Sequence, residues 1–239
     1  MGSTLLLPFE ATVGSGRVGN FLYDVRAFGL ITSVLDEKRW LGSGFAFLHP
    51  EWFVTAQHVV MRDGAPRLDL GVQVLGESRA VKSIFCHPTK DLALLVLSSA
   101  ICSMPFMPAV DSLSRGRLLV SMGYSPRIPE GAMSLQDVRV PNPERKPEGP
   151  QFAFYAHIIE NYKVEVRERR TDTERLMVFD APLAMGGNSG GPVITETGGA
   201  VAVIIEQHQV DGSTIVKATS VIPILQLLRL PPAKDLKLI

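Results

Sequence analysis

Cysteine is scarce in this chain of 239 residues, which contains only Cys86 and Cys102. Small secreted proteins usually carry several disulfides, because these bonds form and persist in oxidising compartments. We expect ordinary thiols here, with Cys86 packed in a strand, although the sequence leaves a single bridge between the two open. The start of the chain, residues 1–9, also lacks the basic and long apolar regions of a signal peptide. Both features predict a cytoplasmic protein.

Net charge, long apolar runs and metal-binding spacings are also lacking. The 24 basic residues balance the 24 acidic ones, so no charge excess favours nucleic acid or an anionic membrane surface. No run approaches the ~18 apolar residues of a membrane span. Because no His-x-x-x-His or Cys-x-x-Cys spacing occurs, we expect neither a metal nor a cofactor. His49 and His87 each precede a proline and are interpreted as turn residues.

Short apolar runs are what the chain does have, within a hydrophobic content of 46% that is ordinary for a globular protein. Gly, Ser, Pro or charged residues separate most of these runs, which is typical of strands and turns. The spacing of the first set predicts a closed antiparallel barrel of about six strands. These six runs cover residues 27–35, 40–48, 52–55, 68–75, 80–86 and 92–97.

The second half of the chain is also rich in predicted strands. They cover residues 117–123, 151–159, 163–169, 176–179, 192–195, 200–207 and 213–219, and a helix is expected at 221–230. Residues 125–150 are rich in proline and predict a long loop. The predicted fold is therefore all-β, with a C-terminal helix. We expect an N-terminal segment at 1–26, a first barrel at 27–103, a connection at 104–116, a second set of strands at 117–219, and a helix and tail at 220–239.

The stretch Met185–Val193 places one hydroxyl, that of Ser189, among four glycines. Glycine permits backbone conformations that a Cβ forbids and lets another chain approach closely. Apolar runs precede and follow this stretch, which a flexible linker would lack. We therefore expect a tight loop between two strands that presents the Ser189 side chain.

This loop resembles the Gly-Asx-Ser-Gly-Gly-Pro signature of the trypsin-like serine peptidases, which have the chymotrypsin fold. Two further blocks resemble that family in the required order of His, Asp and Ser. Thr55-Ala-Gln-His58, preceded by Gly42-Ser-Gly-Phe45, resembles the histidine block, and Asp91-Leu-Ala-Leu-Leu resembles the aspartate block. The resemblance thus covers most of the chain. It implies two six-stranded antiparallel barrels, the second formed by residues 117–219, with the active site between them.

The resemblance implies a serine endopeptidase whose catalytic residues are His58, Asp91 and Ser189. His58 is then the base that activates the Ser189 hydroxyl, and Asp91 orients the imidazole. The family's oxyanion hole corresponds to the amides of Gly187 and Ser189. Asn188 replaces the Asp with which secreted relatives bind a newly cleaved amino terminus, so we expect no activation by such a cleavage.

Substrate contacts are also implied by the resemblance. Counting back six residues from the nucleophile places Leu183 at the floor of the primary specificity pocket, and Ala218 and Ile204 are expected to line the site. An apolar floor predicts apolar side chains at the residue preceding the cleaved bond (P1). Lys217 would favour an acidic residue instead if its ammonium pointed inward.

Two other functional classes remain to be weighed. A catalytically idle two-barrel module would bind peptides or partners with a blocked site, because sequence alone does not show geometry. An α/β-hydrolase esterase is disfavoured, since its triad runs in the order Ser, Asp, His and its elbow reads Gly-x-Ser-x-Gly. The expected partners are protein or peptide substrates, with a regulatory partner or a larger assembly as a further option.

Overall fold

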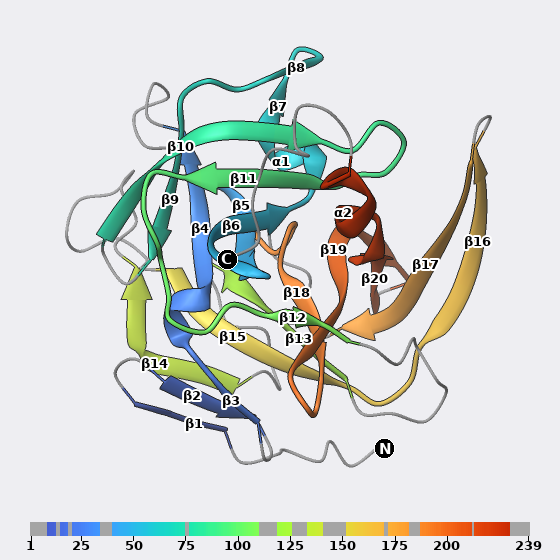
Figure 1. Cartoon of the computed structure of the whole chain (residues 1–239). Helices are drawn as coiled ribbons and strands as arrows, with labels where there is room; N and C mark the ends of the chain where they lie inside the picture. The colour runs from blue at the N-terminus through green and yellow to red at the C-terminus, as the bar shows by residue number, and fades with distance from the viewer. Residues whose placement is uncertain are drawn as a thin grey trace.

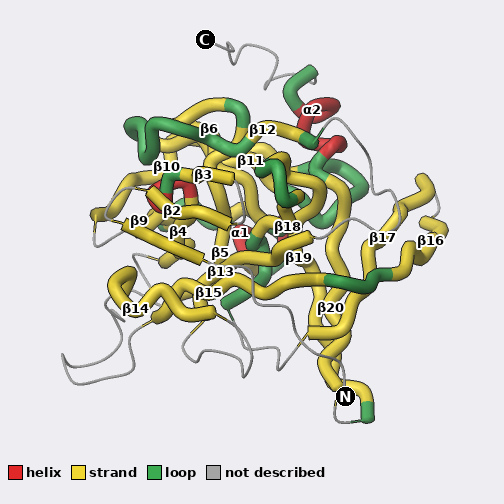
Figure 2. The backbone as a smooth tube through the Cα atoms, turned by 90° about the horizontal axis from the view of Figure 1, so that it is seen from below, coloured by secondary structure: helices red, strands yellow, loops and turns green. Residues whose placement is uncertain are grey.

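The described part of the fold is built almost entirely from β-strands, with three short helical segments (Figures 1 and 2). The structure, a computed structural model, describes most of the chain. The described residues are 9–12, 15–18, 21–33, 40–74, 77–109, 119–125, 133–140, 152–169, 172–181, 187–211 and 213–229. No helix within them is long and apolar enough to cross a lipid bilayer.

The first unit is a closed antiparallel barrel, as the sequence predicts. Its strand order is β10-β11-β6-β5-β4-β9. Phe53 lies in its interior, and a Cβ on Gly44 would lie 2.3 Å from the Phe53 ring, so glycine allows this close packing. The six strands are β4 (Phe28–Ser33), β5 (Trp40–Phe47), β6 (His49–Thr55), β9 (Leu70–Val74), β10 (Glu77–Cys86) and β11 (Ala93–Leu97).

The second unit is a nine-stranded sheet of order β14-β15-β13-β18-β19-β20-β17-β16, in which β12 pairs with β19. Among the described residues these strands form one long sheet, and closure of the second barrel stays a prediction. Its strands are β12 (Met107–Pro108), β13 (Leu119–Ser125), β14 (Met133–Val140), β15 (Phe152–Ile159), β16 (Lys163–Arg169), β17 (Asp172–Ala181), β18 (Pro192–Thr195), β19 (Gly199–Val210) and β20 (Ser213–Ser220).

Strand β14 lies within the segment 125–150, for which the sequence predicted only a long loop. Its register against β15 shifts between Ser134 and Arg139, so a large bulge interrupts the alternation of apolar residues. The pattern that would identify a strand is broken at that point. The N-terminal segment likewise contains a three-stranded sheet, made of β1 (Phe9–Thr12), β2 (Ser15–Val18) and β3 (Phe21–Tyr23).

A shared core joins the barrel to the long sheet. Met122 and Tyr124 of β13 belong to the same buried cluster as Phe45 and Phe53 of the barrel. The connection between the units crosses this region, where Phe106 exchanges backbone hydrogen bonds with Ala46 and Leu48 at 2.9 Å each. The relative position of the two units is therefore fixed by packing.

The C-terminal helix α2 (Ile222–Leu227) lies within the predicted range 221–230. Pro223 stands in its first turn, where a missing N–H costs nothing. Ile224 and Leu227 are buried in the same shared core. The helix that follows β20 therefore packs against this shared core.

Candidate active site

His58 stands on a one-turn helix, α1 (Gln57–Val60), directly after strand β6. Val59 and Val60 bury their side chains in the core, whereas the His58 side chain is 48% exposed. Strand β11 pairs with β6 so that Ala93 lies opposite Thr55. This register brings the segment before β11 beside the segment after β6, which is where Asp91 and His58 lie.

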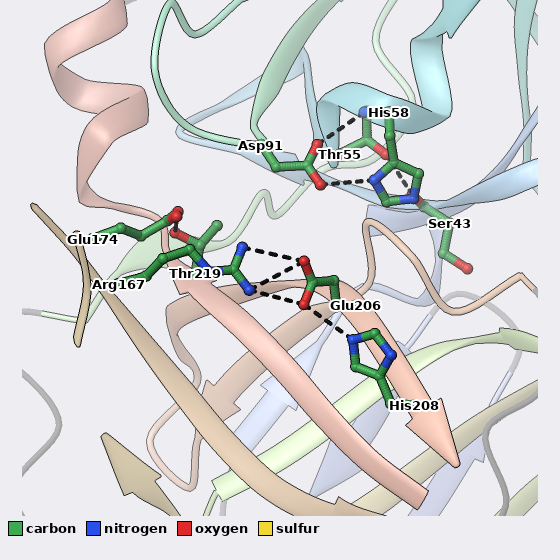
Figure 3. Close-up of polar contacts among 9 residues, drawn as sticks. All are labelled: Ser43, Thr55, His58, Asp91, Arg167, Glu174, Glu206, His208 and Thr219. Atoms are coloured by element: carbon green, nitrogen blue, oxygen red, sulfur yellow. Dashed lines mark hydrogen bonds and ion pairs between the residues drawn. The ribbon is translucent and has the colours of Figure 1, made fainter. Parts of the chain in front are cut away.

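The Asp91 carboxylate binds His58 at two points (Figure 3). Oδ1 accepts the backbone N–H of His58 at 2.9 Å, and Oδ2 lies 2.8 Å from Nδ1 of the ring. A carboxylate only accepts hydrogen bonds, so the Nδ1 nitrogen must carry a proton. In the neutral imidazole the other nitrogen, Nε2, then has a free lone pair and can act as a base.

Ser189 lies in a tight turn, which the amide of Gly191 closes by donating to the carbonyl of Asn188 at 2.9 Å. Strand β19 fixes this turn: Gly190 N donates to Ile204 O at 2.7 Å, and Ile204 N donates to Gly191 O at 2.9 Å. Gly190 has φ +89°, and a Cβ there would lie 2.0 Å from the carbonyl oxygen of Ser43. Only glycine fits this position.

Ser43, on strand β5, connects the nucleophile turn to the barrel. Its amide donates to Ser189 O at 2.8 Å, and its hydroxyl donates to Gly187 O at 2.5 Å. The same hydroxyl accepts the amide of Tyr124 at 3.0 Å, and Thr55 Oγ1 donates to the Ser43 carbonyl at 2.8 Å. This role was not predicted from the sequence, although a polar Ser between two glycines of a buried strand is the signal that would have indicated it.

The nucleophile turn lies close to helix α1, which carries His58, and Gly42 lies between the two. A Cβ on Gly42 would lie 2.8 Å from both Ser189 O and Val59 Cγ2, so the turn and the residue after His58 pack on the same glycine. Among the described residues, hydrogen bonds join His58 to Asp91 but not to Ser189. Catalytic hydrogen bonds are commonly long in unliganded enzymes and shorten when substrate binds.

The predicted oxyanion-hole residues lie in the same turn. Gly187 has φ +108°, and a Cβ there would lie 2.8 Å from Tyr124 O, so glycine is required. Among the hydrogen bonds of the described residues, none uses the amide of Gly187 or that of Ser189. Asn188 between them is buried and carries no charge.

The predicted specificity residues lie on β19 and β20 or outside the described part of the chain. Leu183 falls outside the described residues. Ile204 and Ala218 are Cα partners in the β19–β20 register, and both side chains are buried in the core of the long sheet. The backbone of Ile204 holds the nucleophile turn. A role of these residues in a specificity pocket stays a prediction.

A charged cluster lies on the long sheet and was not recognised in the sequence. Arg167 of β16 donates to both carboxylate oxygens of Glu206 on β19, at 2.9 to 3.2 Å, and His208 Nε2 lies 3.2 Å from Glu206 Oε2 (Figure 3). The hydrogen bonds from Arg167 lower the pKa of Glu206 to about 2. In the sequence, the alternating charges of residues 163–167 are typical of a hairpin with one solvated face.

Cys86 and Cys102 are both free, so the possible bridge between them does not form. Burial raises the pKa of both thiols, to about 12 for Cys102. Thiols of this kind are not reactive at neutral pH. No group of three or more His, Cys, Asp or Glu side chains in the described part of the chain is arranged to hold a metal ion.

Comparison with known proteins places this geometry in a family. Residues 42–203 match the model of the trypsin-like peptidase domain. No curated protein matches the chain. Several solved structures are similar to it.

The active form of the Rv3671c protease from M. tuberculosis is 19% identical at TM-score 0.60, covering 86% of this chain and 80% of that chain. Neuropsin, a serine protease of mouse brain, is 14% identical at TM-score 0.57, covering 86% of this chain and 93% of that one. The HtrA-type protease AlgW is 17% identical at TM-score 0.55, covering 86% of this chain and 60% of that one. At these identities the solved structures support the chymotrypsin-like fold, and the family match supports the activity. The chain belongs to the trypsin-like peptidase family and is a serine endopeptidase.

Proposed function

We propose that the protein hydrolyses peptide bonds through a triad of Ser189, His58 and Asp91. The single observation that carries this proposal is the double hydrogen bond from His58 to Asp91, with the Ser189 turn packed beside the same helix. His58 Nε2 takes the proton of the Ser189 hydroxyl as this attacks the scissile carbonyl. An acyl-enzyme forms, and water activated by the same imidazole then hydrolyses it.

The amides of Gly187 and Ser189 stabilise the tetrahedral intermediate in this mechanism. Negative charge develops on the former carbonyl oxygen, and preorganised N–H donors lower its energy without reorganisation. Two observations support this role: the positive φ of Gly187, and the absence of other acceptors for either amide among the described residues. Loss of one such donor costs about 100- to 1,000-fold in rate.

Activation of the enzyme does not require cleavage at the amino terminus in this proposal. The residue before the nucleophile is Asn188, which is buried and uncharged, and so offers no negative charge to pair with a new ammonium group. The turn is instead held by neutral hydrogen bonds from Ser43 and Ile204. We expect the chain to be active as synthesised.

Apolar P1 side chains are the proposed substrate preference, based on Leu183 as the pocket floor. The acidic alternative has less support, because the Lys217 ammonium donates to Glu165 Oε2 at 3.3 Å. Its charge is therefore already partly balanced. Digestion of a peptide library, with cleaved bonds identified by mass spectrometry, tests the preference; cleavage mainly after Arg or Lys would contradict it.

A catalytically idle binding module is the competing function. The decisive experiment is labelling with a fluorophosphonate, which reacts only with an activated serine. We expect wild type and Ser83→Ala to label and Ser189→Ala not to label; Ser83 is exposed on β10 and serves as the matched control. Equal labelling of the Ser189→Ala variant, or no labelling of folded wild type, would favour the idle module.

A further inference from the structure

Asp91 approaches His58 from a turn, residues 87–92, between strands β10 and β11. Strand pairing does not fix the carboxylate itself, so other contacts must hold it. We propose that His87 and Lys90 are positioning residues for Asp91, and that Lys90 acts by anchoring the turn to the long sheet. This inference rests on the proposed mechanism, because it concerns the residue that orients the base.

His87 organises the turn from inside. Its Nδ1 accepts the amides of Thr89 at 3.2 Å and Lys90 at 3.1 Å, and its own amide donates to Leu92 O at 2.8 Å. The side chain is buried, so without this nitrogen the two amides would lose a buried acceptor. A neutral ring with the proton on Nε2 is required for Nδ1 to accept. The imidazole therefore sets the shape of the turn that presents Asp91.

Lys90 links the turn to the long sheet. Its Nζ donates to the carbonyl of Thr173 on β17 at 3.1 Å, although 83 residues separate the two in the sequence. Lys90 is only 7% exposed, and burying an ammonium is costly unless its protons are accepted. Because Lys90 directly precedes Asp91, movement of this anchor displaces the carboxylate.

The acceptor of Lys90 is itself fixed. The residue after Thr173 is Glu174, which accepts a hydrogen bond from Thr219 Oγ1 on β20 at 2.8 Å. Opposite Glu174 on β16 lies Arg167, which binds Glu206 on β19 (Figure 3).

Strands β16 and β19 are three steps apart in the sheet, about 14 Å if it were flat. The Arg167–Glu206 ion pair therefore spans a curled sheet and braces the β16–β17 hairpin. Thr173 pairs with Glu168 of β16, and the contacts of its neighbour Glu174 with Thr219 and of Arg167 with Glu206 tie this part of the hairpin to β20 and β19.

Small displacements of Asp91 matter because its bond to His58 Nδ1 is short, at 2.8 Å. A misplacement of about 1 Å, caused by a change far from the chemistry, can cost about 100-fold in rate. Loss of the anchor should therefore reduce kcat by about tenfold or more. KM should change little, because neither His87 nor Lys90 is proposed to touch substrate.

The test compares Lys90→Met with Lys82→Met, a control on an exposed position of β10. A second pair compares His87→Leu, which lacks the acceptor, with His87→Asn, whose side-chain oxygen can accept amides two or three residues ahead. Four quantities are measured for each variant: kcat and KM on a peptide substrate, the melting temperature, and the far-downfield proton resonance of His58 Nδ1–H by NMR.

We expect Lys90→Met and His87→Leu to lose about tenfold or more in kcat and to shift or broaden the His58 resonance. We expect Lys82→Met to resemble wild type, and His87→Asn to recover most of the kcat lost in His87→Leu. A smaller loss in kcat, or an unchanged resonance, overturns the proposal. If Lys90→Met does not fold, the His87 pair decides.

The NMR measurement separates failure of the proposed catalytic function from failure of the proposed positioning role of His87 and Lys90. If wild-type protein hydrolyses no peptide, the proposed function fails, and the His58 resonance alone then decides whether His87 and Lys90 position Asp91.

Discussion

Replacing Asp91 with asparagine is the most direct test of the geometry. The amide keeps the shape of the carboxylate, and its oxygen can still accept the His58 amide that Oδ1 accepts at 2.9 Å. Its NH₂ group would then face His58 Nδ1, which lies 2.8 Å from Oδ2. Two donors cannot share that contact, so Nδ1 must lose its proton and Nε2 must gain one. The base is then unable to accept the proton of Ser189.

The expected loss can be estimated from this change of tautomer. In the well-studied triad of this family the same substitution costs about 10,000-fold in kcat, equivalent to about 5.5 kcal/mol of activation free energy. Stability should change by no more than about 1 kcal/mol, because the contact between His58 and Asp91 is partly exposed. The assay is kcat on a peptide substrate, together with urea unfolding to confirm the fold.

Asp63→Asn is the matched control, since Asp63 is 94% exposed in the turn between β7 (Met61–Arg62) and β8 (Ala65–Pro66). It should retain the activity of wild type. An Asp91→Asn variant that folds and keeps more than about a tenth of the wild-type kcat would refute the assigned tautomer and with it the role of Asp91.

Three further outcomes follow from the contacts around the site. Gly190→Ala should cost more than about 3 kcal/mol in urea unfolding and abolish hydrolysis, because a Cβ would lie 2.0 Å from Ser43 O at a positive φ; a stable, active variant would contradict this. Ser43→Ala should lower stability by about 2 kcal/mol and reduce kcat, since it leaves Gly187 O without its donor; both are measurable on the same preparation. Glu206→Gln should lower stability by about 1 kcal/mol at pH 7 by weakening the contact with Arg167. Because the folded pKa of Glu206 is lowered from 4.5 to about 2, this difference should persist above pH 4.5 and vanish as the pH falls towards 2 in denaturation curves; a difference independent of pH would refute it.

The first barrel was predictable from the sequence because its strands obey local rules. Each is a short apolar run bounded by turn residues, and β5 and β6 differ from the predicted ranges by one to three residues. Strand β14 escaped prediction because its bulge between Ser134 and Arg139 breaks the period of two. Strands β1 to β3 have only three or four residues each, which is too short for a pattern to be distinguished from chance.

The residues of the candidate triad were likewise predictable, because each lies in a compact motif with its neighbours in the sequence. The contacts that hold these motifs in place were not. The hydrogen bond from Ser43 to Gly187 joins residues 144 positions apart, and that from Lys90 to Thr173 joins residues 83 apart. A pattern of single residues carries no record of such pairs. They become visible only when the fold brings the two units together.

These long-range contacts connect the two units in both directions. The nucleophile turn belongs to the long sheet by sequence, yet Ser43 of the barrel binds two of its carbonyls. The Asp91 turn belongs to the barrel, yet Lys90 binds the long sheet. The barrel therefore holds the nucleophile turn of the long sheet in place, and the long sheet holds the Asp91 turn of the barrel in place. A substitution that loosens the interface should then reduce catalysis before it unfolds either unit, since catalytic geometry tolerates smaller displacements than core packing does.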